Sequence, residues 1–195
     1  MNHPVTVTVT RTTHRPRKGI LIRLLAAIPL LVWGYLWGVA AIVAAVASWV
    51  STLFTGRSPE FLHVFIARYI RYVTQSLGYL SMLGQRFPGF LADGPADADF
   101  SVSGPREQRR STVGFRLILA VPIIILFDAL QTVWLIVAAF GWVIVLFTQE
   151  LPVGLRNVGA WILRLQAETL AYLGLLTERY PRVDVNPPVA HAAAY

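Results

Sequence analysis

The chain contains no cysteine, which excludes disulfide bonds, thiol nucleophiles and thiolate metal ligands. Charge is scarce as well, since only 14% of the 195 residues are charged, against about 25% in a typical soluble domain. No charged residue lies between Arg23 and Arg57, a stretch of 33 residues. A soluble core helix of that length would keep a polar face, and about 20 apolar residues are enough to cross a bilayer. The sequence therefore predicts a membrane protein.

Motifs of catalysis and cofactor binding are also lacking. Three of the four histidines lie near the chain ends, no two have His-x-x-x-His spacing, and no Gly-x-Ser-x-Gly, Walker-type or Gly-x-Gly-x-x-Gly motif occurs. A hydrolase needs an activated nucleophile within reach of a base, and a metal enzyme needs several convergent ligands. We therefore expect no enzyme, no catalytic residue, no bound metal and no cofactor.

The strongest feature that the sequence does have is an internal repeat. A shift of 93 positions places residues 23–88 on residues 116–181 without a gap, and roughly twenty of those 66 positions are identical. In each copy a long apolar run, at 24–54 and 117–149, precedes a helix of mixed polarity. The repeat predicts an all-α integral membrane protein, built as a duplicated helical hairpin with four membrane-embedded segments.

Composition divides the chain further. We expect a polar basic tail over 1–18, membrane repeat 1 over 19–92, a polar linker over 93–111, membrane repeat 2 over 112–183 and a C-terminal tail over 184–195. The first apolar run has 31 residues and would form a helix of about 46 Å, whereas the hydrocarbon core measures about 30 Å. The run therefore tilts, projects beyond the bilayer or breaks near Pro29, and we expect the break. Alternating residues near positions 5 and 98 fit either short strands paired outside the membrane or polar tails.

The placement of the second helix of each copy stays open, because it either spans the bilayer or lies on its surface. If each copy crosses twice, the copies are parallel and twelve basic residues gather on one side, with only Arg57 opposite. This bias favours two hairpins in the plasma (inner) membrane with both termini in the cytoplasm. The net charge of +7 favours contact with anionic headgroups, and no nucleic-acid-binding module is visible.

Specific motifs recur in both copies. They are FRLILAVPIII at 115–125, WVIVLFTQELP at 142–152 and AYLGLLTERYP at 171–181, with the counterparts IRLLAAIPLL at 22–31, WVSTLFTGRSPEF at 49–61 and GYLSMLGQRFP at 78–88. In these motifs each copy resembles a bacterial membrane family catalogued as domain of unknown function number 4389. The resemblance implies a small bacterial integral membrane protein and no particular reaction. Repeat 2 departs from the motif at Gln149, and repeat 1 departs at Gly84.

Asp128 is a candidate functional residue, because it is the one acid within the long apolar runs. At helical rise it lies about 18 Å into its segment and Arg164 about 21 Å into the next, so we expect a buried pair. Glu168, one turn from Arg164, and Arg71, the repeat mate of Arg164, complete a candidate buried polar cluster. The cluster is expected to lock helices together, and a polar relay or headgroup site is the alternative.

Small residues suggest a helix-packing face in the first apolar run. Gly34, Gly38, Ala41 and Ala45 share one side of a helix, where another backbone can approach closely. This face predicts helix packing, with a homodimer as one outcome.

These features favour a non-catalytic multi-pass membrane protein, an accessory or scaffold subunit of a bacterial cell-envelope complex. Such a subunit would have a protein partner or form a homo-oligomer within the membrane. The alternative is a lipid or small-molecule transport component that acts as an oligomer, which the duplication and the polar residues Asp128 and Arg164 favour.

Overall fold

The chain folds as two copies of one unit, each a short strand followed by two helices. The computed structural model describes residues 5–9, 17–94, 96–102 and 110–181. In chain order the elements are β1 (Val5–Val9), α1 (Arg17–Thr55), α2 (Glu60–Leu80), β2 (Ala98–Val102), α3 (Arg110–Thr148) and α4 (Val153–Leu173). The order β-α-α occurs twice, which confirms the repeat and the mainly helical fold that the sequence predicts.

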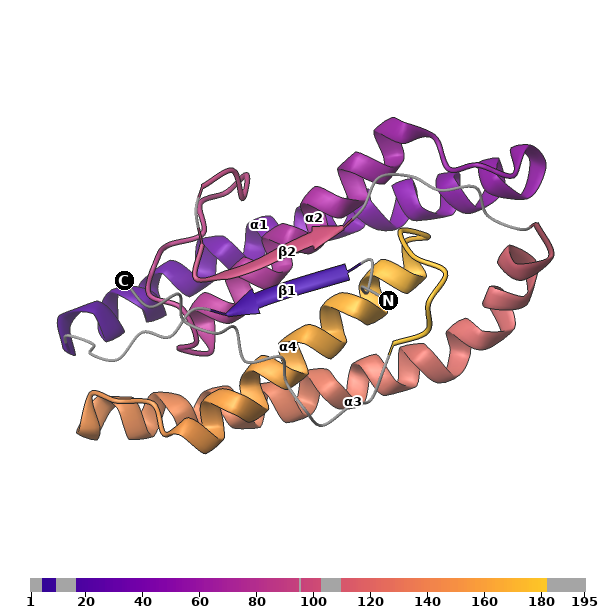
Figure 1. The fold of residues 1–195 in the computed structure, drawn as a ribbon. Coiled ribbons are helices and arrows are strands. Elements are labelled where there is room, and N and C mark those ends of the chain that lie inside the picture. Colours follow the sequence, from indigo (N-terminus) through magenta and orange to yellow (C-terminus); the bar gives the residue numbers. More distant parts are fainter. Residues whose placement is uncertain (1–4, 10–16, 95, 103–109, 182–195) are drawn as a thin grey trace, which may run out of the picture.

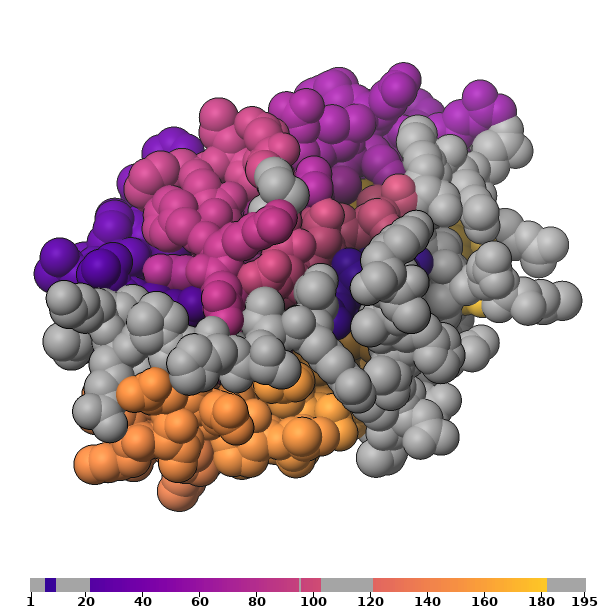
Figure 2. Space-filling view, turned by 60° about the vertical axis from the view of Figure 1, so that its left-hand side comes forward, coloured from indigo at the N-terminus to yellow at the C-terminus, as the bar shows by residue number. Residues whose placement is uncertain are grey.

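The elements form three layers (Figure 1). β1 and β2 pair as an antiparallel sheet, which packs on α2 and α4, and α1 and α3 lie on the far side of those helices. Ala98 and Phe100 on the inner face of the sheet are buried, whereas Thr6, Thr8 and Ser101 on its outer face are exposed. Of the two alternatives for these segments, paired short strands are therefore confirmed. Figure 2 shows residues 81–94 and β2, in magenta, lying over repeat 1.

A pseudo-two-fold axis relates the copies, because exchanging them leaves the register of the sheet unchanged. The same symmetry appears in two hydrogen bonds between the copies. Trp49 Nε1 donates to the Leu173 carbonyl at 2.9 Å, and Trp142 Nε1 donates to the Leu80 carbonyl at 2.7 Å. Each copy thus offers the same patch to the other, as in a two-fold symmetric dimer.

α1 continues through Pro29 over 39 residues, and α3 continues through Pro122 over the same length. The break that we expected at Pro29 is wrong. A proline removes one backbone hydrogen bond, and helices tolerate it where neighbouring groups satisfy the backbone and tertiary packing holds the helix. Here α1 packs along α2, and Tyr72 of α2 donates to the Leu30 carbonyl at 2.7 Å, so tertiary packing holds α1 next to the proline.

α1 and α3 run in opposite directions (Figure 1). Residues 81–94 and β2 return along the helices, so that α3 begins at the end of the molecule where α1 finishes. The expectation of two parallel hairpins is therefore wrong. Charge counting favoured it, but the pairing of β2 with β1 sets the direction of the second copy.

Two of the described helices are long and apolar enough to cross a membrane. Ile22–Thr55 has 34 residues with a mean hydropathy of 2.1, and Val121–Thr148 has 28 residues with a mean hydropathy of 2.2. Within the most apolar 18-residue stretch of each helix, only 22% is buried, whereas a core helix of a soluble protein would be mostly buried. α2 and α4 do not have this composition, so two rather than four described helices qualify by length and hydropathy.

Both helical hairpins have a threonine at the same position of the turn. The hydroxyl of Thr55 accepts the backbone N–H two positions further on at 3.3 Å, and the hydroxyl of Thr148 does the same. The next residue takes a left-handed conformation, with φ of 79° at Gly56 and 63° at Gln149. Glycine adopts this conformation without strain, and glutamine does not.

Candidate functional site

Arg71 and Asp99 form a bidentate ion pair between α2 and β2. Arg71 Nε donates to Asp99 Oδ1 at 2.6 Å, and Arg71 Nη2 donates to Asp99 Oδ2 at 2.8 Å. Gln75 donates to Asp99 Oδ1 at 3.0 Å from the next turn of α2. Partial burial alone would raise the pKa of Asp99, but the hydrogen bonds from Arg71, Gln75 and the Phe100 N–H outweigh it and lower that pKa.

Arg164, the repeat mate of Arg71, contacts an acid on its own helix instead. Its Nε donates to Glu168 Oε1 at 2.8 Å, and the Glu168 side chain is 3% exposed. The strand position that holds Asp99 in β2 holds Thr6 in β1. Both arginines are therefore neutralised, each by a carboxylate from a different kind of element.

Asp128 lies apart from these pairs. Its side chain is exposed on α3, and it makes no ion pair with a described residue. The expected Asp128–Arg164 contact does not form, because the helical phase of α3 turns Asp128 outward and Glu168 is the partner of Arg164. Depth along a helix carries no information about which side of the helix a residue occupies. The candidate cluster resolves into two separate pairs and one exposed acid.

The small-residue face of α1 packs on α2 of the same copy. A Cβ added at Gly38 would lie 2.8 Å from the Tyr69 hydroxyl oxygen, and one at Gly34 would lie 3.3 Å from Tyr72 Cε1. The same side of α1 continues with Ala41, which is buried, and Ala45, which is half-buried. In this chain the face predicted from small residues therefore receives the tyrosines of α2.

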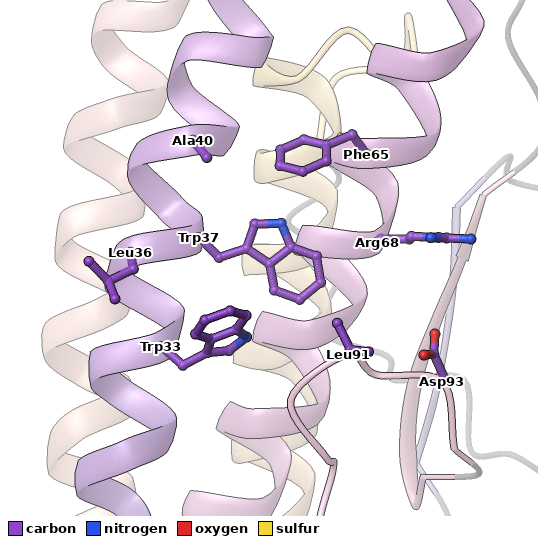
Figure 3. A pocket seen from close by; sticks show the side chains of 8 residues that line it. All are labelled: Trp33, Leu36, Trp37, Ala40, Phe65, Arg68, Leu91 and Asp93. Carbon is purple, nitrogen blue, oxygen red and sulfur yellow. The ribbon is translucent and has the colours of Figure 1, made fainter.

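A cavity of about 450 Å³ opens between α1, α2 and residues 81–94 (Figure 3). Its walls are aromatic, with the Trp37 ring centroid 6.5 Å from that of Trp33 and 6.3 Å from that of Phe65. Trp33 Nε1 donates to the Phe90 carbonyl at 2.7 Å, which ties the 81–94 segment to α1. The cavity thus has two helices and one anchored loop as its frame.

The two ends of this cavity differ in polarity. Leu36 and Ala40, on the exposed side of α1, line one end, and Arg68 and Asp93 line the other. Figure 3 shows both charged side chains toward the strands and away from Leu36. Within the described part of the chain, neither Arg68 nor Asp93 makes an ion pair. One end of the cavity is therefore apolar and the other end is charged.

The aromatic lining is particular to repeat 1. At the positions of Trp33, Trp37 and Phe65, repeat 2 has aliphatic side chains, namely Leu126, Leu130 and Val158. Sequence reasoning missed this site because tryptophans of membrane helices are commonly interfacial anchors and do not by themselves indicate a cavity. A position-by-position comparison of the two copies would have found it, since repeat 1 has three aromatic residues on neighbouring helices where repeat 2 has three aliphatic ones.

The fold and these contacts define a class of protein, a duplicated two-fold symmetric helical module with two helices of membrane length. The chain belongs to the family described as a domain of unknown function, DUF4389, which matches it twice, over residues 17–92 and 110–183. The resemblance found in the motifs is thereby confirmed. No curated protein and no solved structure matches the chain.

Proposed function

We propose that this protein is a non-catalytic membrane protein and serves as an accessory or scaffold subunit of a larger complex in a bacterial cell envelope. The observation that carries the proposal is Asp128, an exposed carboxylate on the apolar outer side of α3. The proposal has three parts: a membrane location, an orientation in the membrane, and a partner for this acid.

The exposed surfaces of α1 and α3 support a membrane location. Large apolar side chains along both helices are exposed, among them Leu25 at 76%, Phe54 at 77% and Phe147 at 74%. Contiguous apolar surface of this extent is rare on soluble monomers and marks a contact with membrane or protein. We assign lipid to most of this surface, because it extends along both long helices.

The course of the chain favours an orientation in which the long helices lie along the membrane plane. A helix of 39 residues measures about 58 Å, roughly twice the hydrocarbon thickness. If α1 and α3 crossed the bilayer, the polar return segment over 81–102 would run through the hydrocarbon beside them. We therefore propose that α1 and α3 are immersed in one leaflet, with the sheet and both termini on the cytoplasmic side, where basic residues are favoured.

Asp128 supports a protein partner within the membrane. A carboxylate in hydrocarbon costs at least about 2.5–3.5 kcal/mol, and such residues usually pair with another group. The corresponding position in repeat 1 is Tyr35, which is also exposed, so the symmetry of the module does not require an acid there. A partner helix with an arginine, lysine or amide opposite Asp128 would remove the cost.

Site-specific photo-cross-linking in cells tests the partner. A photoreactive amino acid is placed at Ile125, one turn before Asp128, and in a control at Val32, its repeat mate on α1. Both side chains are well exposed, at 66% and 56%. We expect a discrete protein adduct from position 125 that is lost in Asp128→Asn, and no such adduct from position 32. Equal labelling from both positions, or an adduct that persists in Asp128→Asn, would contradict the proposal.

Reporter fusions test the orientation. Immersion in one leaflet predicts cytoplasmic signals from residue 57 and residue 95. Two crossing hairpins predict a periplasmic signal from residue 57, which would refute the in-plane placement.

A lipid or small-molecule transport component is a second candidate function. The aromatic cavity of repeat 1 is the observation that favours it.

A further inference from the structure

We propose that the cavity of repeat 1 binds one phospholipid whose headgroup carries both a phosphate and a primary ammonium. The phosphate lies at Arg68, the ammonium lies at Asp93, and part of one acyl chain lies between the aromatic rings. The inference rests on the proposed membrane location, and it does not depend on a protein partner at Asp128.

The size and openness of the cavity fit part of such a lipid. A volume of about 450 Å³ lies within the range of about 300–1,000 Å³ found for small-ligand sites. It holds a headgroup and the upper part of one chain, but not a whole phospholipid. The remaining chain leaves beside Leu36 and Ala40, which belong to the exposed apolar side of α1. The cavity is thus continuous with the surface that we assign to lipid.

The charges at the other end select the headgroup. A guanidinium matches the geometry of a phosphate and binds it with two hydrogen bonds. Arg68 is available for this contact, because it has no acid partner in the described part of the chain. Asp93 lines the same end of the cavity. A headgroup with only negative charge would meet repulsion from this carboxylate, whereas a primary ammonium would pair with it.

The divergence of the repeats argues that the aromatic lining is not needed for folding. In repeat 2 the two helices also pack together, with Leu126, Leu130 and Val158 at these positions in place of the aromatic residues. Aromatic faces suit both an acyl chain and a headgroup ammonium, because their edges pack on apolar atoms and their faces attract cations. Repeat 1 therefore has a lining suited to an amphiphile where repeat 2 has smaller aliphatic side chains.

Native mass spectrometry of the full chain in detergent tests the proposal. Phosphatidylethanolamine and phosphatidylglycerol are added separately at equal concentrations, and the fraction of protein with one bound lipid is measured. We expect phosphatidylethanolamine to bind about tenfold more tightly, a preference that one added charge pair can supply. Phosphatidylglycerol shares the phosphate but has no ammonium, so the two lipids separate the contributions of Arg68 and Asp93.

Variants assign the contacts. Asp93→Asn should remove the preference between the two lipids, and Arg68→Gln should weaken binding of both by about tenfold. Arg57→Gln is the control, since it removes the same charge outside the cavity. Phe65→Val, which installs the residue that repeat 2 uses, should weaken both lipids while the melting temperature stays close to that of the wild type.

Three outcomes would overturn the proposal: equal binding of the two lipids by the wild type, an unchanged preference in Asp93→Asn, or equal effects of Arg68→Gln and Arg57→Gln. If Phe65→Val fails to fold, the two charge variants still decide, because both positions lie at the rim of the cavity. If no protein adduct forms from position 125 in the otherwise wild-type protein while lipid binding is intact, the partner at Asp128 is refuted and this inference stands.

Discussion

Repeats 1 and 2 share one backbone arrangement but fill the contact between their two helices with different pairs of side chains. In repeat 1 a glycine on the long helix, Gly38, faces a large residue on the short helix, Tyr69. In repeat 2 the corresponding residues are Gln131 on the long helix and Ile162 on the short one. Compared with repeat 1, the residue on the long helix is larger and the residue on the short helix is smaller, and Gln131 accepts a hydrogen bond from Gln166 at 2.8 Å. The constraint therefore acts on the pair of positions and not on either one alone.

The two repeats also differ in the element that supplies the acid of the ion pair. Arg71 and Arg164 occupy equivalent positions, but the acid is Asp99 on a strand in one copy and Glu168 on the helix itself in the other. A buried or half-buried arginine needs a counter-charge, and the fold accepts one from either element. Both copies therefore keep a counter-charge for this arginine, but the carboxylate comes from a different element in each copy.

The largest effect should come from breaking the packing exchange. Gly38→Gln installs the repeat 2 residue against Tyr69, whose hydroxyl lies 2.8 Å from the Cβ position. We expect a loss of about 1–3 kcal/mol of stability, because the contact becomes overpacked. Adding Tyr69→Ile completes the repeat 2 combination and should restore most of the loss. Melting temperatures in detergent measure both variants, and a double variant no more stable than Gly38→Gln would show that the two positions are not coupled.

A smaller effect should follow from moving the acid. Asp99→Thr removes the strand acid and should cost about 1 kcal/mol, since the pair with Arg71 is partly exposed. Adding Gln75→Glu places an acid one turn from Arg71, as Glu168 stands to Arg164, and should restore stability. The double-variant cycle is measured by melting at neutral pH. Additive losses would contradict the idea that the two arrangements are equivalent.

The pH dependence of stability gives an independent test of the role of the Asp99 carboxylate. The pKa of Asp99 is lowered in the folded state, so its contribution to stability is present above its unfolded pKa of about 3.9 and is lost as pH falls through the lower folded value. The wild type should therefore lose more stability than Asp99→Thr on acidification below about pH 4. Parallel acid melting curves for the two proteins would refute the role of this carboxylate.

The smallest effect concerns the hairpin turn. Gln149 has the left-handed conformation that Gly56 has in repeat 1. Gln149→Gly should stabilise the protein by about 0.5 kcal/mol, because glycine adopts a positive φ without steric strain and its greater backbone entropy in the unfolded chain offsets part of the gain. The reverse change, Gly56→Gln, serves as the matched control and should destabilise by a similar amount. Thermal melting of both variants is sufficient, and shifts of the same sign would contradict the explanation.

Part of this fold could be predicted from local pattern. The repeat, the long apolar helices and one of two readings of the strand segments all follow from hydropathy and spacing. The continuity of α1 through Pro29 could not be judged in the same way, since it depends on packing against α2, which brings together residues as far apart in the chain as Leu30 and Tyr72, 42 positions. The partner of Arg71 was also out of reach, because Asp99 comes close only through the strand pairing. For Arg164, by contrast, the neighbour Glu168 was visible one helical turn away.

By itself, the sequence determined that this protein is a duplicated module with two helices of membrane length, because repetition and hydropathy are properties of the chain and need no contacts. Only the tertiary structure decided the antiparallel course of α1 and α3, the outward position of Asp128 and the aromatic cavity of repeat 1. Each of these depends on how one copy or helix rotates against another. That rotation is set by packing and strand pairing between residues far apart in the chain, which no local pattern records.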